Sequence, residues 1–266
     1  MPLIPEERID GGVRSVQVAL DVLEAVAFSD EELGVTQIAD RLGLTKGSVH
    51  RHLLTLVERG YLVQNPSTSR YARGPRSRLL AHYAPEADLI QLASGPMREL
   101  RDLLGHSVVL SESSPRGALV SSMVGGTAAA IEIGVRPGSE LQFHSSAQGK
   151  VQLAFASPAM RERVLSKPLP AFTAHTVTDR NQIEEEIARV ARDGFATAPE
   201  QAMLGINAVA APIFDGKDAC IGAIALVGSI QFLPAETDSK SVAALKAAAA
   251  QISRLLGQGS RRQRMA

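Results

Sequence analysis

Residues 36–63 read TQIADRLGLTKGSVHRHLLTLVERGYLV, and this stretch decides the fold of the N-terminal part of the chain. Thr36 is expected to cap a short amphipathic helix, and Gly43 suits the left-handed position that ends it. Thr45 is expected to cap a second, longer helix that Gly60 closes. Two helices joined by a short break with a glycine match the helix-turn-helix plan.

The flanking residues extend this pair of helices to a winged helix. Upstream, residues 13–28 carry apolar side chains at helical spacing and predict a further helix. Downstream, residues 61–63 have strand character, residues 65–67 (NPS) are turn chemistry, and a second strand returns at 70–73. We therefore assign residues 11–74 to a winged helix-turn-helix domain.

A linker is expected next. Residues 75–95 are assigned to a linker helix, and a helical pattern also covers residues 88–104. Gly95 and Pro96 fall in the middle of that pattern. Proline lacks a backbone donor and clashes with the preceding turn, so this helix is expected to break or kink there.

Residues 96–258 mix short strands with helices, and residues 259–266 read as a basic tail. Asp179 is a good cap for one helix, and Pro234 is expected to open a long alanine-rich helix that runs to about Gly257. Strand-like runs cover residues 107–113, 118–124, 130–135, 207–214 and 219–228. This order predicts an α+β domain with an antiparallel sheet.

Charge and composition narrow the class of protein. The 28 Lys and Arg residues balance 28 Asp and Glu residues, yet between Leu44 and Leu80 seven bases accompany one acid, Glu58. A local basic segment is the footprint of a polyanion contact, and a solvated charged face is the alternative. No apolar run reaches the roughly 20 residues that cross a bilayer, and the first residues lack a cationic secretory signal. These features predict a cytoplasmic protein without membrane contact.

DNA binding follows from the geometry of a helix-turn-helix, whose second helix enters the major groove with its first turns aimed at base edges. The wing is expected to follow the backbone or the minor groove. The alternative is a winged helix that contacts protein, as in an interaction scaffold. The candidate DNA-binding residues are Arg14, Thr36, Thr45, Lys46, Ser48, His50, Arg51, Arg70 and Arg73.

Catalysis finds little support in the sequence. The G-x-S-x-G elbow is absent, and His50 and His52 are two residues apart on a helix, unlike a zinc pair. The run of three glutamates at 184–186 reads as a solvated helix face, and Cys220, the single cysteine, reads as a core residue. We expect no enzyme activity, no cofactor and no metal.

The segment HSSAQG, residues 144–149, gathers small and polar groups at the start of a predicted helix. Unpaired backbone N–H groups and the helix dipole make such a start a ready site for a carboxylate. The alternative is that Ser146 merely caps the helix and the other residues pack around it. Both interpretations stay open on these residues.

The whole chain resembles the IclR family of bacterial transcriptional regulators. The resemblance is carried, in order, by VRSVQVALDVLEAV, TQIADRLGLTKGSVHRHLLTLVERGYL, LQFHSSAQGKVQLAF, GFATAPEQAMLGINAVAAPIFD and IGAIALVG. It implies an N-terminal winged helix-turn-helix, a linker helix and a C-terminal GAF-like effector domain. It also implies a homodimer or homotetramer that leaves or binds promoter DNA when a small metabolite binds. We expect a repressor, with Gly95 and Pro96 as the point that transmits the change.

The resemblance also implies an effector site around residues 144–148. Family members that bind very small oxoacids have polar side chains where this chain has Ala198, Ala208, Ala225 and Val227, so the ligand is expected to be an aromatic or otherwise apolar carboxylic acid. The candidate effector-binding residues are Met123, Ile131, His144, Ser145, Ser146, Ala147, Gln148, Ala198, Glu200, Asn207, Ala208, Ala225 and Val227.

Overall fold

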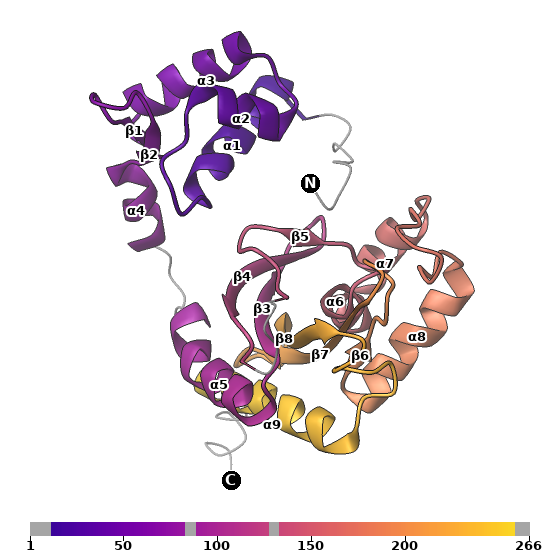
Figure 1. Ribbon diagram of the computed structural model, residues 1–266. Coiled ribbons are helices and arrows are strands. Elements are labelled where there is room, and N and C mark those ends of the chain that lie inside the picture. Colours follow the sequence, from indigo (N-terminus) through magenta and orange to yellow (C-terminus); the bar gives the residue numbers. More distant parts are fainter. Residues whose placement is uncertain (1–11, 83–88, 128–132, 259–266) are drawn as a thin grey trace. The chain divides into compact units, whose positions relative to one another are not determined.

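The computed structural model describes residues 12–82, 89–127 and 133–258 (Figure 1). The chain forms two compact units, residues 1–86 and 87–266, and each is described here by itself. Helices and strands are mixed as expected for the α+β class.

The N-terminal unit is a winged helix. It contains α1 (Arg14–Ala27), α2 (Val35–Leu42), α3 (Lys46–Glu58), β1 (Leu62–Gln64), β2 (Tyr71–Arg73) and α4 (Pro75–His82). The three first helices enclose a core to which each contributes one apolar face, with Val22, Ile38 and Leu53 fully buried. β1 and β2 pair antiparallel as the predicted wing.

The C-terminal end of α2 is as predicted, but its N-cap differs from the prediction. Gly43 has φ +62°, the left-handed conformation that ends α2. The prediction that Thr36 caps α2 is wrong, because the N-cap is Gly34, two residues earlier, and the helix begins at Val35. The side-chain oxygen of Gln37 accepts a hydrogen bond from the Gly34 amide at 3.0 Å, so Gln37 serves the helix start.

A six-stranded sheet forms the centre of the C-terminal unit, with the order β5-β4-β3-β8-β7-β6 and antiparallel neighbours throughout. The strands are β3 (Ser107–Ser113), β4 (Ala118–Val124), β5 (Glu140–Leu141), β6 (Ala196–Thr197), β7 (Ile206–Phe214) and β8 (Cys220–Ser229). The helices are α5 (Leu89–Leu104), α6 (Ala147–Phe155), α7 (Pro158–Leu165), α8 (Arg180–Asp193) and α9 (Ser239–Leu255).

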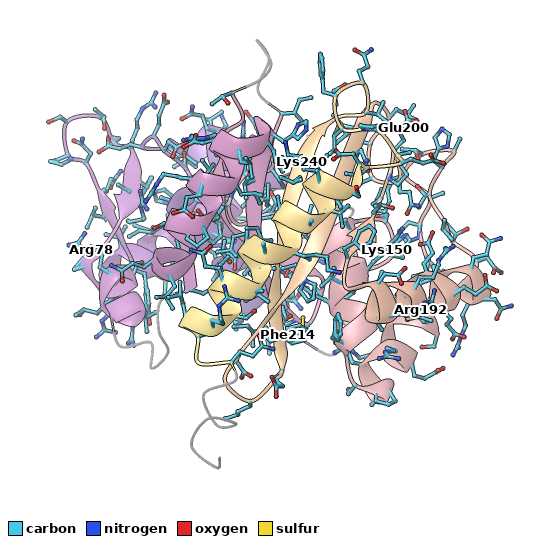
Figure 2. The ribbon with its side chains drawn as sticks, turned by 90° about the horizontal axis from the view of Figure 1, so that it is seen from below. Arg78, Lys150, Arg192, Glu200, Phe214 and Lys240 are labelled. Atoms are coloured by element: carbon cyan, nitrogen blue, oxygen red, sulfur yellow. The ribbon has the colours of Figure 1, made fainter. Side chains whose placement is uncertain are left out.

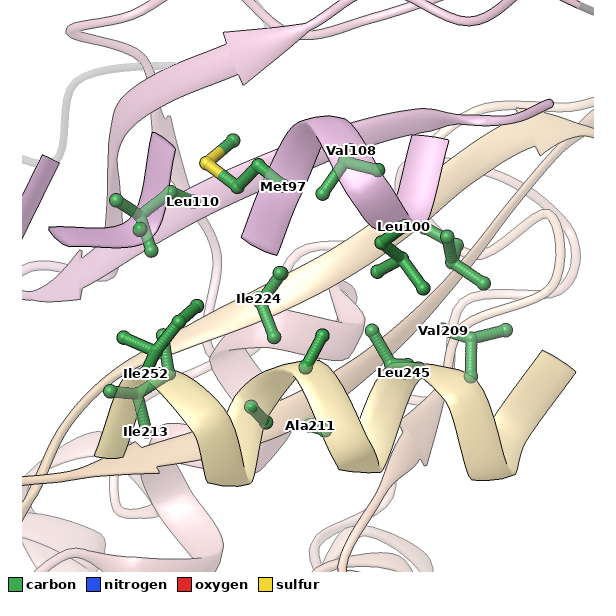
Figure 3. Packing of buried hydrophobic residues seen from close by; sticks show 14 of the residues in the cluster. Met97, Leu100, Val108, Leu110, Val209, Ala211, Ile213, Ile224, Leu245 and Ile252 are labelled. Carbon is green, nitrogen blue, oxygen red and sulfur yellow. The ribbon is translucent and has the colours of Figure 1, made fainter. Parts of the chain in front are cut away.

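Two helices cover one face of this sheet. Figure 3 shows Met97 and Leu100 of α5 and Leu245 and Ile252 of α9 packed over Ile224 of β8. Alternate residues of the strands point to this face because the side-chain period of a strand is two. Burial of these apolar side chains fixes α5 and α9 to the sheet.

The other face is covered by α6 and, beyond it, α8. α6 packs on β7 and β8 over small residues such as Ala210 and Ala225. Its first turn also lies against the chain before it: a Cβ on Gly149 would come within 2.2 Å of the Gln142 carbonyl oxygen. Glycine at this position therefore allows the residues before α6 to fold back closely on the helix start.

Pro96 does not break α5, contrary to the expectation from the sequence. The helix runs continuously from Leu89 to Leu104 with Pro96 inside it. Leu89 and Ala93 before the proline and Met97 and Leu100 after it are buried in the core of the C-terminal unit, which holds both halves of the helix in place. The residues assigned to one linker helix, 75–95, thus contain α4 and the first half of α5.

Two further expectations are corrected. Residues 133–135, the described part of the strand expected at 130–135, are not a strand, and the short β5 pairs with β4 instead. The last helix begins at Ser239 rather than at Pro234, because the side chain of Asp238 caps it by accepting hydrogen bonds from the amides of residues 240 and 241. The C-terminal fold is otherwise as expected.

Candidate DNA interface and effector site

α3 presents a basic N-terminal half to solvent. The hydroxyl of Thr45 accepts a hydrogen bond from the Ser48 amide at 3.3 Å and so caps the helix, as predicted. Lys46, His50 and Arg51 are exposed, whereas Ser48 is half-buried. Because the inward face of α3 is fixed in the core, these three side chains are held on the outer face.

The other candidate DNA contacts lie on other elements of the same unit. Arg73 is exposed on β2, Arg14 is exposed at the first residue of α1, and Thr36 is exposed on α2. Arg70 is exposed on the wing, but one of its guanidinium nitrogens, Nη1, donates to the Glu32 carbonyl oxygen at 3.1 Å. Arg70 therefore has an internal role that the sequence did not indicate.

The loop before α6 is buried and its groups are largely engaged within the chain. His144 is buried, and its Nε2 donates to the Pro170 carbonyl oxygen at 2.9 Å. Burial lowers the pKa of its imidazole, although that hydrogen bond opposes the effect. The Ser146 hydroxyl donates to the Gln142 carbonyl oxygen at 2.7 Å and accepts from the Gly149 amide at 3.0 Å. Ser146 thus caps α6, and Ser145 beside it is buried.

Gln148 and Gln152 of α6 both have buried side-chain atoms without a hydrogen-bond partner among the described residues, Nε2 of Gln148 and Oε1 of Gln152. Gln148 is 1% exposed. Gln152, one turn later on the same helix face, donates from Nε2 to the Glu112 carbonyl oxygen of β3 at 3.1 Å. Gln148 therefore lies on the side of α6 that faces β3. A buried unpaired amide is costly unless a ligand or water binds it.

Several apolar candidates for effector binding lie on the face of the sheet that α6 covers. Val227 and the partly buried Met123 and Ala208 belong to one apolar cluster with Val109 and Val120. The next cluster along the same face holds three more of the predicted residues, Ala147, Ala198 and Ala225. Six predicted residues therefore belong to two apolar clusters on the side of the sheet that α6 covers, and these six residues are called the apolar wall below.

Two predicted effector residues do not join this wall. Asn207 is buried, but its Nδ2 donates to the carbonyl oxygens of Leu233 and Pro234 at 3.1 and 2.9 Å. Its side chain is on the face of β7 opposite to that of Ala208, since successive side chains alternate. The carboxylate of Glu200 accepts from the Gly205 amide at 2.8 Å. Ile131 lies outside the described residues.

A buried ion pair lies directly after the loop, and sequence reasoning missed it. Lys150 Nζ is 2.7 Å from Glu186 Oε2 and donates to the Thr197 carbonyl oxygen at 3.2 Å (Figure 2 labels Lys150). Burial lowers the pKa of the Lys150 ammonium, while Glu186 opposes that shift. The expectation that residues 184–186 are a solvated face is therefore wrong for Glu186, although Glu184 pairs with Arg180 at the surface.

Other features of the described chain carry no second site. Two surface cavities are lined by residues of α6 to α8 and of α9 with Phe195, and none of the predicted effector residues lines either. Cys220 is half-buried at the start of β8, and burial raises the pKa of its thiol to about 11. Within the described residues, no cluster of three His, Cys, Asp or Glu side chains could hold a metal, and no helix could span a membrane.

A winged helix with a basic recognition helix, followed by a separate α+β unit, defines a DNA-binding regulator with a sensor domain. Comparison with known proteins agrees with this class of protein. The IclR helix-turn-helix domain matches residues 15–66, and the C-terminal domain of the bacterial transcriptional regulator IclR matches residues 81–254. The chain belongs to the IclR family of transcriptional regulators.

The similarity to relatives and to solved structures extends over most of the chain. The HTH-type transcriptional regulator BhcR of Paracoccus denitrificans is 30% identical, covering 90% of this chain and 86% of that protein. The transcriptional repressor IclR of Escherichia coli is 26% identical, covering 86% and 85%. The crystal structure of an IclR homolog from Microbacterium hydrocarbonoxydans, complexed with 4-hydroxybenzoate, has a TM-score of 0.75 and 26% identity, covering 91% and 98%. The first two relatives are named as transcriptional regulators, in agreement with the expectation of a regulator and not an enzyme.

Proposed function

We propose that this protein is a transcriptional repressor that binds promoter DNA through α3 and the wing and leaves it when a small apolar carboxylic acid binds to the C-terminal unit. The observation that carries the proposal is the exposed row of Lys46, His50 and Arg51 on the first turns of a capped helix whose other face is buried. Such a helix start offers cations and backbone N–H groups to phosphates and base edges.

The class of effector follows from the wall beside α6. The predicted side chains there are the methyl groups of alanines, one isopropyl group and a thioether, and they offer apolar area rather than hydrogen bonds. Gln148 adds a buried Nε2 donor that has no hydrogen-bond partner among the described residues, which suits the polar end of a ligand. An aromatic acid combines one polar end with a flat apolar body. The complex of the Microbacterium homolog with 4-hydroxybenzoate supports this choice.

The direction of regulation is supported by the relative in Escherichia coli, which is named a repressor. A helix-turn-helix protein that reads two half-sites about one helical turn apart requires two copies of the domain. We therefore propose a homodimer, or a tetramer made of two such dimers, as the DNA-binding form. A regulator of this kind acts on the chromosome, in agreement with the cytoplasmic location expected from the sequence.

Calorimetry on the full chain tests the effector class. Benzoate and 4-hydroxybenzoate are expected to bind and to weaken the complex with a promoter fragment, whereas glyoxylate and pyruvate are expected to bind more weakly or not at all. Tighter binding of glyoxylate or pyruvate would contradict the proposed wall.

A gel-shift salt titration tests DNA binding itself. Phosphate contacts make log K fall with log salt by about 0.9 for each phosphate neutralised. A protein-interaction scaffold, the alternative function, would show no such dependence and no preference for any promoter fragment.

A further inference from the structure

The wing is too small to hold its own shape. β1 and β2 have three residues each, and an isolated two-stranded hairpin is at best marginally stable in water. The loop between α1 and α2 lies beside the hairpin and supports it. The Leu33 amide donates to the Tyr71 carbonyl oxygen at 3.1 Å, and the Tyr71 amide donates back to Leu33 at 2.8 Å. Residue 33 thus adds one bridge of a third strand to β2.

Glu32, the residue before this bridge, connects the same loop to the tip of the wing. Its two carboxylate oxygens accept hydrogen bonds from Asn65 Nδ2 at 3.2 and 3.0 Å. Oε2 also accepts from the Thr68 hydroxyl at 3.1 Å, and the carbonyl oxygen of Glu32 accepts from Arg70 Nη1 at 3.1 Å. Three residues of the wing tip therefore converge on one half-buried acid.

The orientation of the Asn65 amide is fixed by a second set of bonds. Its Oδ1 accepts from the Ser67 amide at 3.0 Å, so Nδ2 is the group that meets Glu32. The Asn65 backbone amide donates to the Arg70 carbonyl oxygen, and its own carbonyl oxygen accepts from the Ser69 amide, each at 2.8 Å. Ser69 has φ +55°, an unfavourable value for a serine, which these bonds hold in place.

We propose that Glu32 is a positioning residue for operator binding, whose carboxylate holds the wing tip, residues 65–70, in the conformation that presents Arg70 and Arg73 to DNA. The inference rests on the proposed DNA-binding function and adds a residue to it. A wing ordered before binding avoids the entropy cost of ordering it on the DNA. The role is unexpected for an acid, because a negative charge beside DNA opposes binding by itself.

The two effects of Glu32 have opposite signs, and this makes the proposal testable. Charge alone predicts that Glu32→Gln binds a promoter fragment more tightly. Positioning predicts weaker binding, by about tenfold, because hydrogen bonds to a charged acceptor are lost. The matched control is Glu31→Gln: Glu31 is exposed, its side chain has no hydrogen-bond partner in the described part of the chain, and the formal charge change is the same. The control is expected to bind as well as the parent protein or slightly better.

A rescue experiment separates positioning from general loss of structure. Asn65→Asp places a second carboxylate against Glu32 and is expected to weaken DNA binding as Glu32→Gln does. In the double variant that carries both changes, the introduced glutamine amide can donate to the introduced aspartate carboxylate, and the net charge equals that of the parent. The double variant is expected to recover affinity to within about threefold of the parent. Additive losses in the double variant would overturn the proposal.

Hydrogen exchange in the free protein gives a measurement that does not depend on DNA. Glu32→Gln is expected to speed exchange of the Ser67 and Ser69 amides, with the amides of α3 unchanged. If neither the exchange rates nor the DNA affinity change, the proposal is overturned. If the parent protein binds no promoter fragment while the wing amides still respond to Glu32→Gln, the proposed function fails. The assignment of Glu32 as a positioning residue then fails with it, although Glu32 still orders the wing.

Discussion

Removing the two partners of the buried ion pair Lys150–Glu186 should have unequal effects. The side chain of Lys150 is 2% exposed and that of Glu186 is 20% exposed. Glu186→Gln leaves an ammonium in the interior without its counter-ion, near Arg189, which adds to the repulsion. Removing one partner of a buried pair typically costs about 3–5 kcal/mol. Because glutamine keeps one acceptor oxygen, we expect a loss of about 2 kcal/mol in the free energy of unfolding.

The reverse change should be milder. Lys150→Met replaces the lysine stem with an apolar chain of similar length, and the remaining Glu186 carboxylate is close enough to the surface to be hydrated. We expect a loss below about 1.5 kcal/mol. The chain has no tryptophan, and its three tyrosines lie at 61, 71 and 83, in the first unit. Tyrosine fluorescence therefore follows the first unit as an internal control, while far-UV circular dichroism in urea follows both.

The stability difference between Glu186→Gln and the parent protein should also depend on pH, in a direction that the pKa of Lys150 determines. Burial lowers the pKa of Lys150 in the folded protein, and loss of Glu186 lowers it further. Above the folded-state pKa and below the unfolded value, the unfolded chain binds more protons, so stability rises with pH. The difference between Glu186→Gln and the parent should therefore shrink between pH 7 and pH 10. A difference independent of pH, or a larger loss for Lys150→Met, would refute this reasoning.

Three further predictions concern binding. Arg51→Ala should weaken promoter binding by about 1–3 kcal/mol if Arg51 reads a base, whereas Arg59→Ala, at the far end of α3, should change the affinity little. Equal losses in an anisotropy assay would argue against α3 as the element that reads the DNA. Gly47→Ala should stabilise the first unit by about 0.5–1 kcal/mol, since nothing lies within 4 Å of the added Cβ, yet weaken DNA binding because the added methyl group crowds the DNA groove. Unchanged affinity would show that Gly47 has no role in DNA binding. Gln148→Leu should abolish the response to benzoate while DNA affinity is kept. The control Gln152→Leu, which loses the hydrogen bond to Glu112, should instead lower the free energy of unfolding by about 1 kcal/mol. A normal benzoate response in Gln148→Leu would contradict the proposed ligand contact.

The parts of the fold that were predictable depend on short-range interactions. Thr45 and Asp179 cap their helices through amides three residues away, and Gly43 and Gly194 end helices with positive φ. Each of these signals is complete within one helix turn. The helix-turn-helix, the wing and most strands of the sheet could therefore be predicted from the sequence.

The parts that were missed depend on residues distant in the chain. Glu32 meets Asn65 across 33 residues, and Asn207 meets Leu233 across 26. Their residue types are also common on surfaces and in loops, so no local pattern marks them. The local cost of Pro96 predicts a break in α5, whereas the packing of α5 against the sheet outweighs that cost.

The candidate effector site contains some features that the sequence predicts and others that only the structure shows. The apolar character of the wall follows from residue types, and the alternation of β7 separates Ala208 from Asn207 once the strand is known. The cap formed by the Ser146 hydroxyl is one of the two interpretations that the sequence leaves open, whereas the use of Glu200 to hold Gly205 required the three-dimensional arrangement. Gln148 gains its importance from a buried Nε2 that no other described residue pairs with, which a sequence cannot show.

Fluorescence anisotropy of the protein on the promoter region of its own and neighbouring genes, titrated with salt and then with 4-hydroxybenzoate, examines both halves of the proposal in one sample. We expect tighter binding to one fragment than to a shuffled fragment, a slope of log K against log salt of several times about −0.9, and release on addition of the acid. Equal affinity for both fragments, with a flat salt dependence and no response to any aromatic acid, would contradict it.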